Sequence, residues 1–93
     1  MNTPKIVDIK TALRLYYENS EISNQQIQEL FGKLSSATIA RLKKQVYEKM
    51  IEQEVFVFCQ RNINTAVAYE VFGIDVDDLE RRMRKLQELQ SNQ

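Results

Sequence analysis

Histidine and tryptophan are absent from this chain of 93 residues, and it has a single cysteine, Cys59. The lack of histidine removes the side chain most used for zinc binding and for general acid–base catalysis. One cysteine cannot form an internal disulfide. We therefore expect an intracellular protein without a cofactor or a metal. The longest uncharged apolar stretch, Val55 to Cys59, is far shorter than the roughly 20 residues of a membrane span. These features favour a cytoplasmic protein with no membrane partner.

Glycine and proline are also scarce, with two residues and one residue respectively. Proteins built from many hairpins need these residues in their turns, so the composition predicts an all-α fold. With 43% apolar residues, the chain can form a single compact helical domain over residues 1–93. Thirteen basic side chains balance thirteen acidic ones, so any charged partner must be inferred from local clusters.

The first half of the chain carries clear start and stop signals for helices. Thr3 and Pro4 suit the cap and the first position of a helix, which we expect to run to about residue 19. Ser23 followed by Gln26 forms a capping box, in which each side chain satisfies a backbone N–H group. The helix that follows should end at Gly32, because glycine tolerates the left-handed conformation that stops a helix.

A third helix is predicted after this glycine, with Ser35 or Ser36 as its cap. Its apolar positions recur every three or four residues and define a buried face: Ile39, Leu42, Val46 and Met50. A short helix, a glycine turn and a longer helix form a helix-turn-helix arrangement. We expect this first unit to occupy residues 1–46.

The sequence also contains an internal repeat, which a shift of 41 positions reveals. The matching pairs are Ile22-Ser23 with Ile63-Asn64, and Phe31-Gly32 with Phe72-Gly73. Asp75 can cap the helix that follows the second glycine. The repeat therefore predicts a second unit, similar to a helix-turn-helix, over residues 47–93.

The segment Val55–Phe58 leaves two interpretations open. Its β-branched and aromatic residues are typical of a strand. The repeat places it on the first helix of the first unit, and a helical stripe continues into it. On that basis we expect the third helix to run from about Ser36 to Cys59 and to be shared by both units.

The run from Ile63 to Met83 resembles the helix-turn-helix of excisionase-like and MerR-like DNA-binding domains. In those families a short helix ends in an apolar-Gly-apolar turn, and a second helix follows. The run from Ser23 to Lys44 is similar to the broader helix-turn-helix superfamily, with a turn one residue longer. The resemblance implies a small protein that binds double-stranded DNA, either a transcriptional regulator or a mobile-element accessory factor.

Charge indicates which of the two units would contact DNA. In a helix-turn-helix the second helix enters the major groove, while cations and hydroxyl groups hold phosphates. From Lys33 through Gln45 there are four cations and no acid, whereas the last helix opens with Asp77 and Asp78, which would repel phosphates. We expect the first unit to bind DNA. Its base-facing residues are Thr38, Arg41, Lys44 and Gln45, and its phosphate-binding residues are Lys33, Ser35 and Ser36.

Three further expectations concern the core and the partners. All tyrosines and phenylalanines are expected to pack in the core, since a base-stacking platform would need them exposed beside cations. Cys59 is expected to be a buried small hydrophobic residue. DNA binding is expected to use a homodimer, because regulatory sites are usually read as paired half-sites.

The sequence lacks a glycine-rich phosphate loop, a nucleophile elbow and an acid–base pair, so we expect neither an enzyme nor a small-molecule substrate. The rival hypothesis is a helical protein-interaction adaptor that uses the helix-turn-helix shape only as scaffold. It is motivated by the zero net charge. A single-stranded RNA binder is a weaker third hypothesis, because the sheet and aromatic motifs of such modules are missing.

Overall fold

The computed structural model describes residues 4–91, which form five helices and one small antiparallel sheet. In chain order the elements are α1 (Ile9–Glu18), β1 (Glu21–Ile22), α2 (Asn24–Phe31), α3 (Ser36–Glu52), β2 (Ile63–Asn64), α4 (Thr65–Phe72) and α5 (Val76–Ser91). The predicted, mostly helical fold class is confirmed. No helix within residues 4–91 is both long and apolar enough to cross a membrane.

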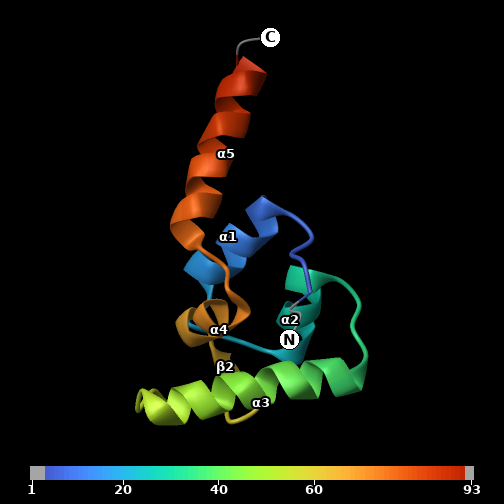
Figure 1. Ribbon diagram of the computed structural model, residues 1–93, viewed down its shortest axis with the longest axis vertical. Coiled ribbons are helices and arrows are strands. Elements are labelled where there is room, and N and C mark those ends of the chain that lie inside the picture. Colours follow the sequence, from blue (N-terminus) through green and yellow to red (C-terminus); the bar gives the residue numbers. More distant parts are fainter. Residues whose placement is uncertain (1–3, 92–93) are drawn as a thin grey trace.

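The molecule is elongated and measures 47 × 27 × 23 Å, and its helices are stacked one above another along the long axis. Figure 1 shows α3 lying across one end of the molecule, with α2 and α4 next to each other above it. α5 projects from the opposite end, where its first half packs against α1 (Figure 1). One face of α3 is therefore free of other helices.

α1 starts later than the sequence analysis predicted. The helix begins at Ile9 and not at Pro4, because Asp8 caps it. The Asp8 carboxylate accepts hydrogen bonds from the backbone N–H of Thr11 at 2.7 Å and from the Thr11 hydroxyl at 3.1 Å. Pro4 lies ahead of the helix, and Thr3 lies outside the described residues.

The predicted boundaries of α2 and the start of α3 are confirmed. Ser23 and Gln26 form the capping box at the start of α2. Gly32 ends the helix with φ of 87°, and a Cβ built there would stand 3.4 Å from Val7 Cγ1. Glycine is required at this position by its backbone conformation. Ser35 caps α3, since its hydroxyl accepts the backbone N–H of Thr38 at 3.2 Å.

The internal repeat is visible in the local structure. α2 and α4 each have eight residues, and each follows a capping residue, Ser23 in the first case and Asn64 in the second. Each ends at a glycine with positive φ, Gly32 and Gly73. The shift of 41 positions therefore reproduces the cap, the helix and its end.

Repeat-related residues also meet in space. Ile22 of β1 pairs directly with Ile63 of β2, and both are fully buried. The rings of Phe31 and Phe72 lie edge to face with centroids 5.1 Å apart. The two copies thus face each other around a local two-fold axis at the centre of the core. The symmetry does not extend past the glycines, because α3 packs against α4 whereas α5 packs against α1.

The expectation of an unbroken third helix to Cys59 is wrong. α3 ends at Glu52, and Glu54 has φ of 57°. The backbone N–H of Val55 donates to the carbonyl oxygen of Met50 at 2.9 Å, which closes the helix end. The chain must turn back here, because Ile63 returns to pair with β1.

The segment Val55–Phe58 is neither helix nor strand. Its side chains alternate, however, as they would in a strand. Val55 and Val57 pack against the core, whereas Phe56 and Phe58 point outward with exposed fractions of 84% and 102%. We call residues 53–62, which connect α3 to β2, the phenylalanine loop.

The predicted core is only partly correct. The rings that are buried or half-buried are those of Tyr16, Phe31, Tyr47, Tyr69 and Phe72. Phe56, Phe58 and Tyr17 are exposed, and so is Cys59, which was expected to be buried. Tyr17 lies at the edge of α1, where its hydroxyl donates to Glu80 of α5. The other three belong to the phenylalanine loop, whose outward side is covered by no helix or strand of residues 4–91.

Candidate nucleic-acid interface

The candidate interface is built on the N-terminal half of α3. The sequence has no acid from Leu30 to Tyr47, and the buried face of α3 is the predicted apolar stripe. Lys33, Ser36, Arg41 and Lys44 are exposed, and we call these four residues the reading surface. The three cations of this surface form no ion pair with any residue in the range 4–91.

The other three predicted site residues are placed differently. The Ser35 hydroxyl lies 2.9 Å from the Thr38 hydroxyl and also accepts the Thr38 backbone N–H. Ser35 therefore serves the helix cap, and Thr38 is half-buried beside it. Gln45 is also half-buried. At about 100° per residue, Thr38 and Gln45 lie on the flank of α3 opposite Ser36. The five predicted residues that lie on α3 thus spread over more than half of the helix circumference.

A groove of about 580 Å³ follows the other flank of α3. Its lining comes from α2, through Asn24 and Gln28, and from α3, through Ser36, Ile39, Ala40, Lys43, Lys44, Tyr47, Glu48 and Ile51. Two residues of the reading surface, Ser36 and Lys44, belong to this lining. Toward the C-terminal end of α3 its lining contains Tyr47, Glu48 and Ile51.

Lys43 is a half-buried cation of α3 that is engaged within the molecule. Its ammonium group donates to the carbonyl oxygen of Arg61 at 2.6 Å. Four residues further along α3, the hydroxyl of Tyr47 donates to the carbonyl oxygen of Gln60 at 3.1 Å. The two side chains hold the phenylalanine loop against α3.

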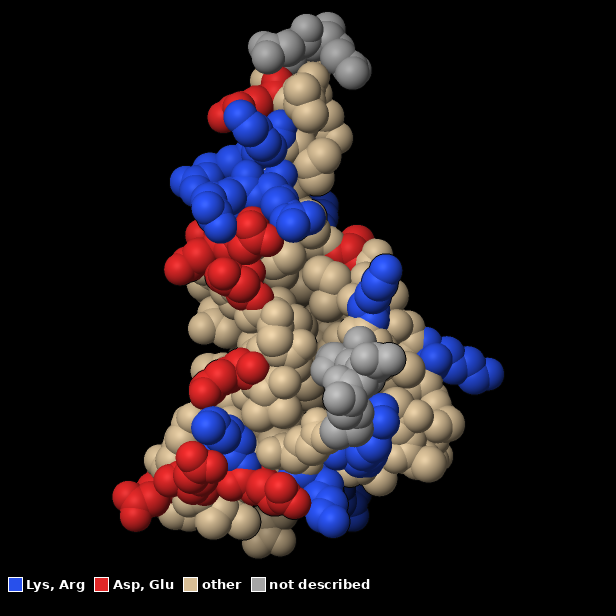
Figure 2. Space-filling view, viewed as in Figure 1, with Lys and Arg blue, Asp and Glu red and all other residues tan. Residues whose placement is uncertain are grey.

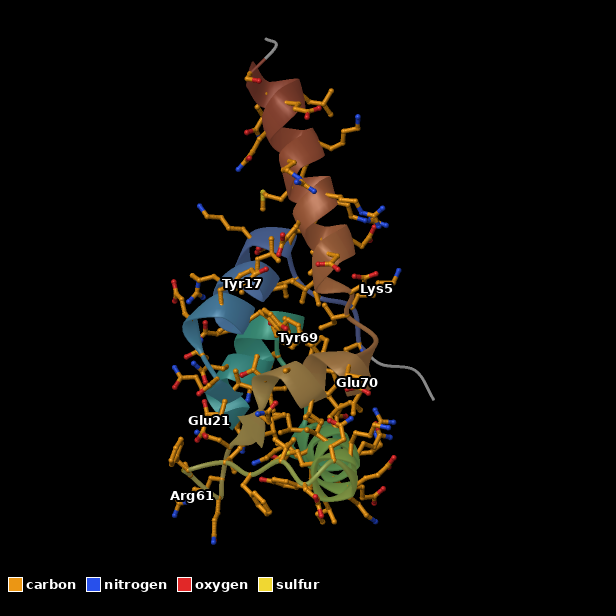
Figure 3. The ribbon with its side chains drawn as sticks, turned by 90° about the vertical axis from the view of Figure 1, so that its left-hand side faces the viewer. Lys5, Tyr17, Glu21, Arg61, Tyr69 and Glu70 are labelled. Atoms are coloured by element: carbon orange, nitrogen blue, oxygen red, sulfur yellow. The ribbon has the colours of Figure 1, made fainter. Side chains whose placement is uncertain are left out.

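Glu21 holds the same loop from β1. Its carboxylate accepts the backbone N–H groups of Phe58 at 2.9 Å and Cys59 at 3.1 Å, and the Asn62 amide at 2.9 Å. These hydrogen bonds hold the pKa of Glu21 below its ordinary value, because they favour the ionised carboxylate. In Figure 3, Glu21 and Arg61 lie close together at the lower edge of the molecule.

Arg61 is a candidate site residue that the sequence analysis missed. It is exposed and lines a hollow of about 360 Å³ together with Asn24 and Gln25 at the start of α2. A helix N-terminus and a guanidinium both favour an anion. The pairing of β1 with β2 and the hydrogen bond from Lys43 to the carbonyl oxygen of Arg61 bring this residue to the corner. The repeat contained the signal, because the pairing of Ile22 with Ile63 places the preceding residue, Asn62, beside the start of α2.

Charge is divided along α3. Figure 2 shows acidic side chains gathered around the C-terminal end of α3 and basic ones toward its N-terminal half. The acidic residues are Glu48, Glu52 and Glu54, all exposed. A polyanion would therefore meet the N-terminal half of α3 first.

The acidic start predicted for α5 is present in the structure. Asp75 accepts the backbone N–H of Asp78 at 3.1 Å, and Asp78 pairs with Arg81 at 3.1 Å and Arg82 at 2.8 Å. Figure 2 shows the basic cluster of α5 directly above these acids. In the described residues, no three Cys, Asp or Glu side chains gather in a way that could hold a metal ion.

Comparison of the chain with protein-family models, with curated proteins and with solved structures gave no match.

Proposed function

We propose that this protein binds double-stranded DNA through α2, the turn at residues 32–35 and α3, with the N-terminal half of α3 in the major groove. The observation that carries the proposal is the reading surface: three exposed cations without ion pairs, on a stretch without acids. Cations of this kind gain affinity for DNA by releasing counterions from phosphates.

The residues of the surface would take different roles. Arg41 and Lys44 lie in the second and third turns of α3, where side chains reach base edges and the nearest phosphates. Lys33, in the turn, would contact the backbone. Arg61 and the start of α2 would hold a second phosphate, because backbone N–H groups at a helix N-terminus favour an anion. Ser35 supports this geometry through the helix cap.

Within this proposal the biological role is transcriptional regulation or accessory function in recombination. We expect the DNA-bound form to be a homodimer, because one module of this size buries a small interface. Its dimer contact would lie away from the N-terminal half of α3, which the duplex occupies.

The test is titration of a random-sequence duplex at low salt with the wild-type chain and two double variants. Arg41→Ala/Lys44→Ala removes two cations of the reading surface. Arg84→Ala/Lys85→Ala removes two exposed cations of α5 and is the matched control. We expect the first variant to bind at least tenfold more weakly, with unchanged helix content by circular dichroism, and the control to bind nearly as the wild type does. Equal losses in both variants, or no binding by the wild type, would contradict the proposal.

The adaptor hypothesis is favoured by a different observation. Phe56 and Phe58 form an exposed aromatic pair, and exposed aromatic residues are typical anchors of protein–protein contacts. A wild-type chain without salt-sensitive DNA binding would support this hypothesis.

A further inference from the structure

The phenylalanine loop carries the most exposed apolar surface near the reading surface. Phe58 is fully exposed, Phe56 is 84% exposed, and Ile51, at the end of α3, is 78% exposed. Large apolar side chains that are this exposed are unfavourable in water unless a partner covers them.

The loop is fixed in place before any partner arrives. Side chains outside the loop hold its second half, residues 58–62, with five hydrogen bonds: three to the carboxylate of Glu21, one from Lys43 and one from Tyr47. A surface that is already ordered loses less conformational entropy on binding. The loop therefore presents its two aromatic rings as preformed anchors.

An apolar groove suited to such anchors lies on the same molecule. The groove of about 580 Å³ along α3 has Ile39, Ala40, Tyr47 and Ile51 in its lining. Lys43 and Tyr47 belong both to the groove and to the loop contacts, so the groove and the loop are neighbours. A surface that carries an anchor beside a matching groove is self-complementary, as the interface of a two-fold dimer must be.

Charge favours a second copy of the chain over nucleic acid as the partner of the loop. The acids Glu48, Glu52 and Glu54 are exposed in the C-terminal part of α3 and at the start of the loop, and would repel phosphates there. The groove carries two cations and one acid, Lys43, Lys44 and Glu48, and the ammonium group of Lys43 already donates to the loop. The loop also carries one acid and one cation, Glu54 and Arg61. In a dimer, Glu54 and Arg61 of each copy can therefore pair with Lys44 and Glu48 of the other copy. Because the net charge of the chain is zero, the two copies do not repel each other as a whole.

We propose that two copies of the chain associate in the absence of DNA, each inserting Phe56 and Phe58 into the α3 groove of the other. Ser36 and Lys44 line that groove, so the dimer covers half of the reading surface. Self-association and DNA binding then compete. The competition between dimer formation and DNA binding rests on the proposed function. The dimer itself does not depend on DNA binding.

The test of the dimer is sedimentation equilibrium of the full chain over a range of concentrations, without DNA. Phe56→Ser/Phe58→Ser removes the two anchors, and Leu86→Ser/Leu89→Ser removes two exposed leucines of α5 as the matched control. All four side chains are exposed, so both variants should retain the helix content of the wild type. We expect a wild-type dimer, a dissociation constant raised by about tenfold or more in the loop variant, and an unchanged control.

A second arm adds duplex to the wild type and to the loop variant. We expect the loop variant to bind DNA more tightly than the wild type at protein concentrations where the wild type is dimeric. A wild type that stays monomeric, or a control that dissociates as readily as the loop variant, overturns the dimer. Weaker DNA binding by the loop variant overturns the competition and assigns the loop to the duplex. If neither the wild type nor the loop variant binds DNA, the proposed function is contradicted. The sedimentation experiment alone then tests whether the dimer forms.

Discussion

Tyr69 connects α4 to α1 at the centre of the molecule. Its side chain is fully buried, and its hydroxyl donates to the carbonyl oxygen of Ala12 at 2.6 Å. Figure 3 places Tyr69 inside the molecule. Burial disfavours the charged phenolate and raises the pKa of Tyr69 to about 12.

Tyr69 should make the fold sensitive to alkali. Its pKa is about 12 when folded and about 10 when unfolded, so the folded state holds the proton more tightly. The stabilisation is complete below pH of about 10 and is lost as the pH rises through about 12. Urea denaturation between these values should show the loss. In Tyr69→Phe it should be smaller, although this variant loses about 1 kcal/mol at neutral pH. Equal alkaline losses in both chains would contradict the assignment.

Thr65, the first residue of α4, carries a buried hydroxyl without a hydrogen-bond partner among the described residues. A buried polar group without a partner costs free energy that an apolar group of the same shape does not. Thr65→Val should therefore raise the free energy of unfolding by about 1 kcal/mol and the melting temperature by roughly 5 °C. Thermal denaturation measures both. A decrease would show that the hydroxyl is satisfied in solution.

At the scale of the element, the phenylalanine loop depends on Glu21. In Glu21→Gln the charged acceptor of three hydrogen bonds is lost. Amide hydrogen exchange at Phe58 and Cys59 should then become faster, while exchange in α4 stays unchanged.

Lowering the pH should also reduce the protection of the Phe58 and Cys59 amides from hydrogen exchange in the wild type. The pKa of Glu21 is lowered in the folded chain, so its stabilisation of the loop is present above about pH 4.3 and is lost as the pH falls through the folded pKa. Amide hydrogen exchange at Phe58 and Cys59, measured as the pH is lowered, checks that the loop loses protection in acid. If exchange in Glu21→Gln matched the wild type, the carboxylate would not hold the loop.

Short-range chemistry explains which elements the sequence could predict. The capping box of Ser23 and Gln26, the glycine end at Gly32 and the cap at Ser35 each act within four residues, and all are present. The start of α1 was misplaced because two possible helix starts lie close together in the sequence, one at Thr3 and Pro4 and one at Asp8. The side chain of Asp8 makes the capping hydrogen bonds to Thr11.

Long-range contacts explain what the sequence could not predict. The end of α3 is set by the pairing of Ile22 with Ile63, which turns the chain back after Glu54. The repeat was extended too far upstream, and a helix was therefore expected where the phenylalanine loop lies. Exposure of Phe56 and Phe58 depends on which elements cover them, which periodicity does not reveal.

For the whole molecule, the sequence located the basic half of α3 but not the full candidate surface. Arg41 and Lys44 are exposed, as a helical wheel predicts, and Lys33 is exposed in the turn before α3. Arg61 joins them through the long-range contacts of the loop, and Lys43 is engaged by its hydrogen bond to the carbonyl oxygen of Arg61. Local charge predicts the cations of the surface, whereas tertiary structure decides which of them a partner can reach.

The salt dependence of DNA binding tests the central claim most directly. The logarithm of the binding constant should fall linearly with the logarithm of salt concentration, because phosphate contacts release counterions. We predict that Arg41→Ala/Lys44→Ala reduces this slope by about two, one for each lost contact, and that Arg84→Ala/Lys85→Ala leaves it unchanged. A slope near zero for the wild type, or a slope that only the α5 variant changes, would contradict DNA binding through α3.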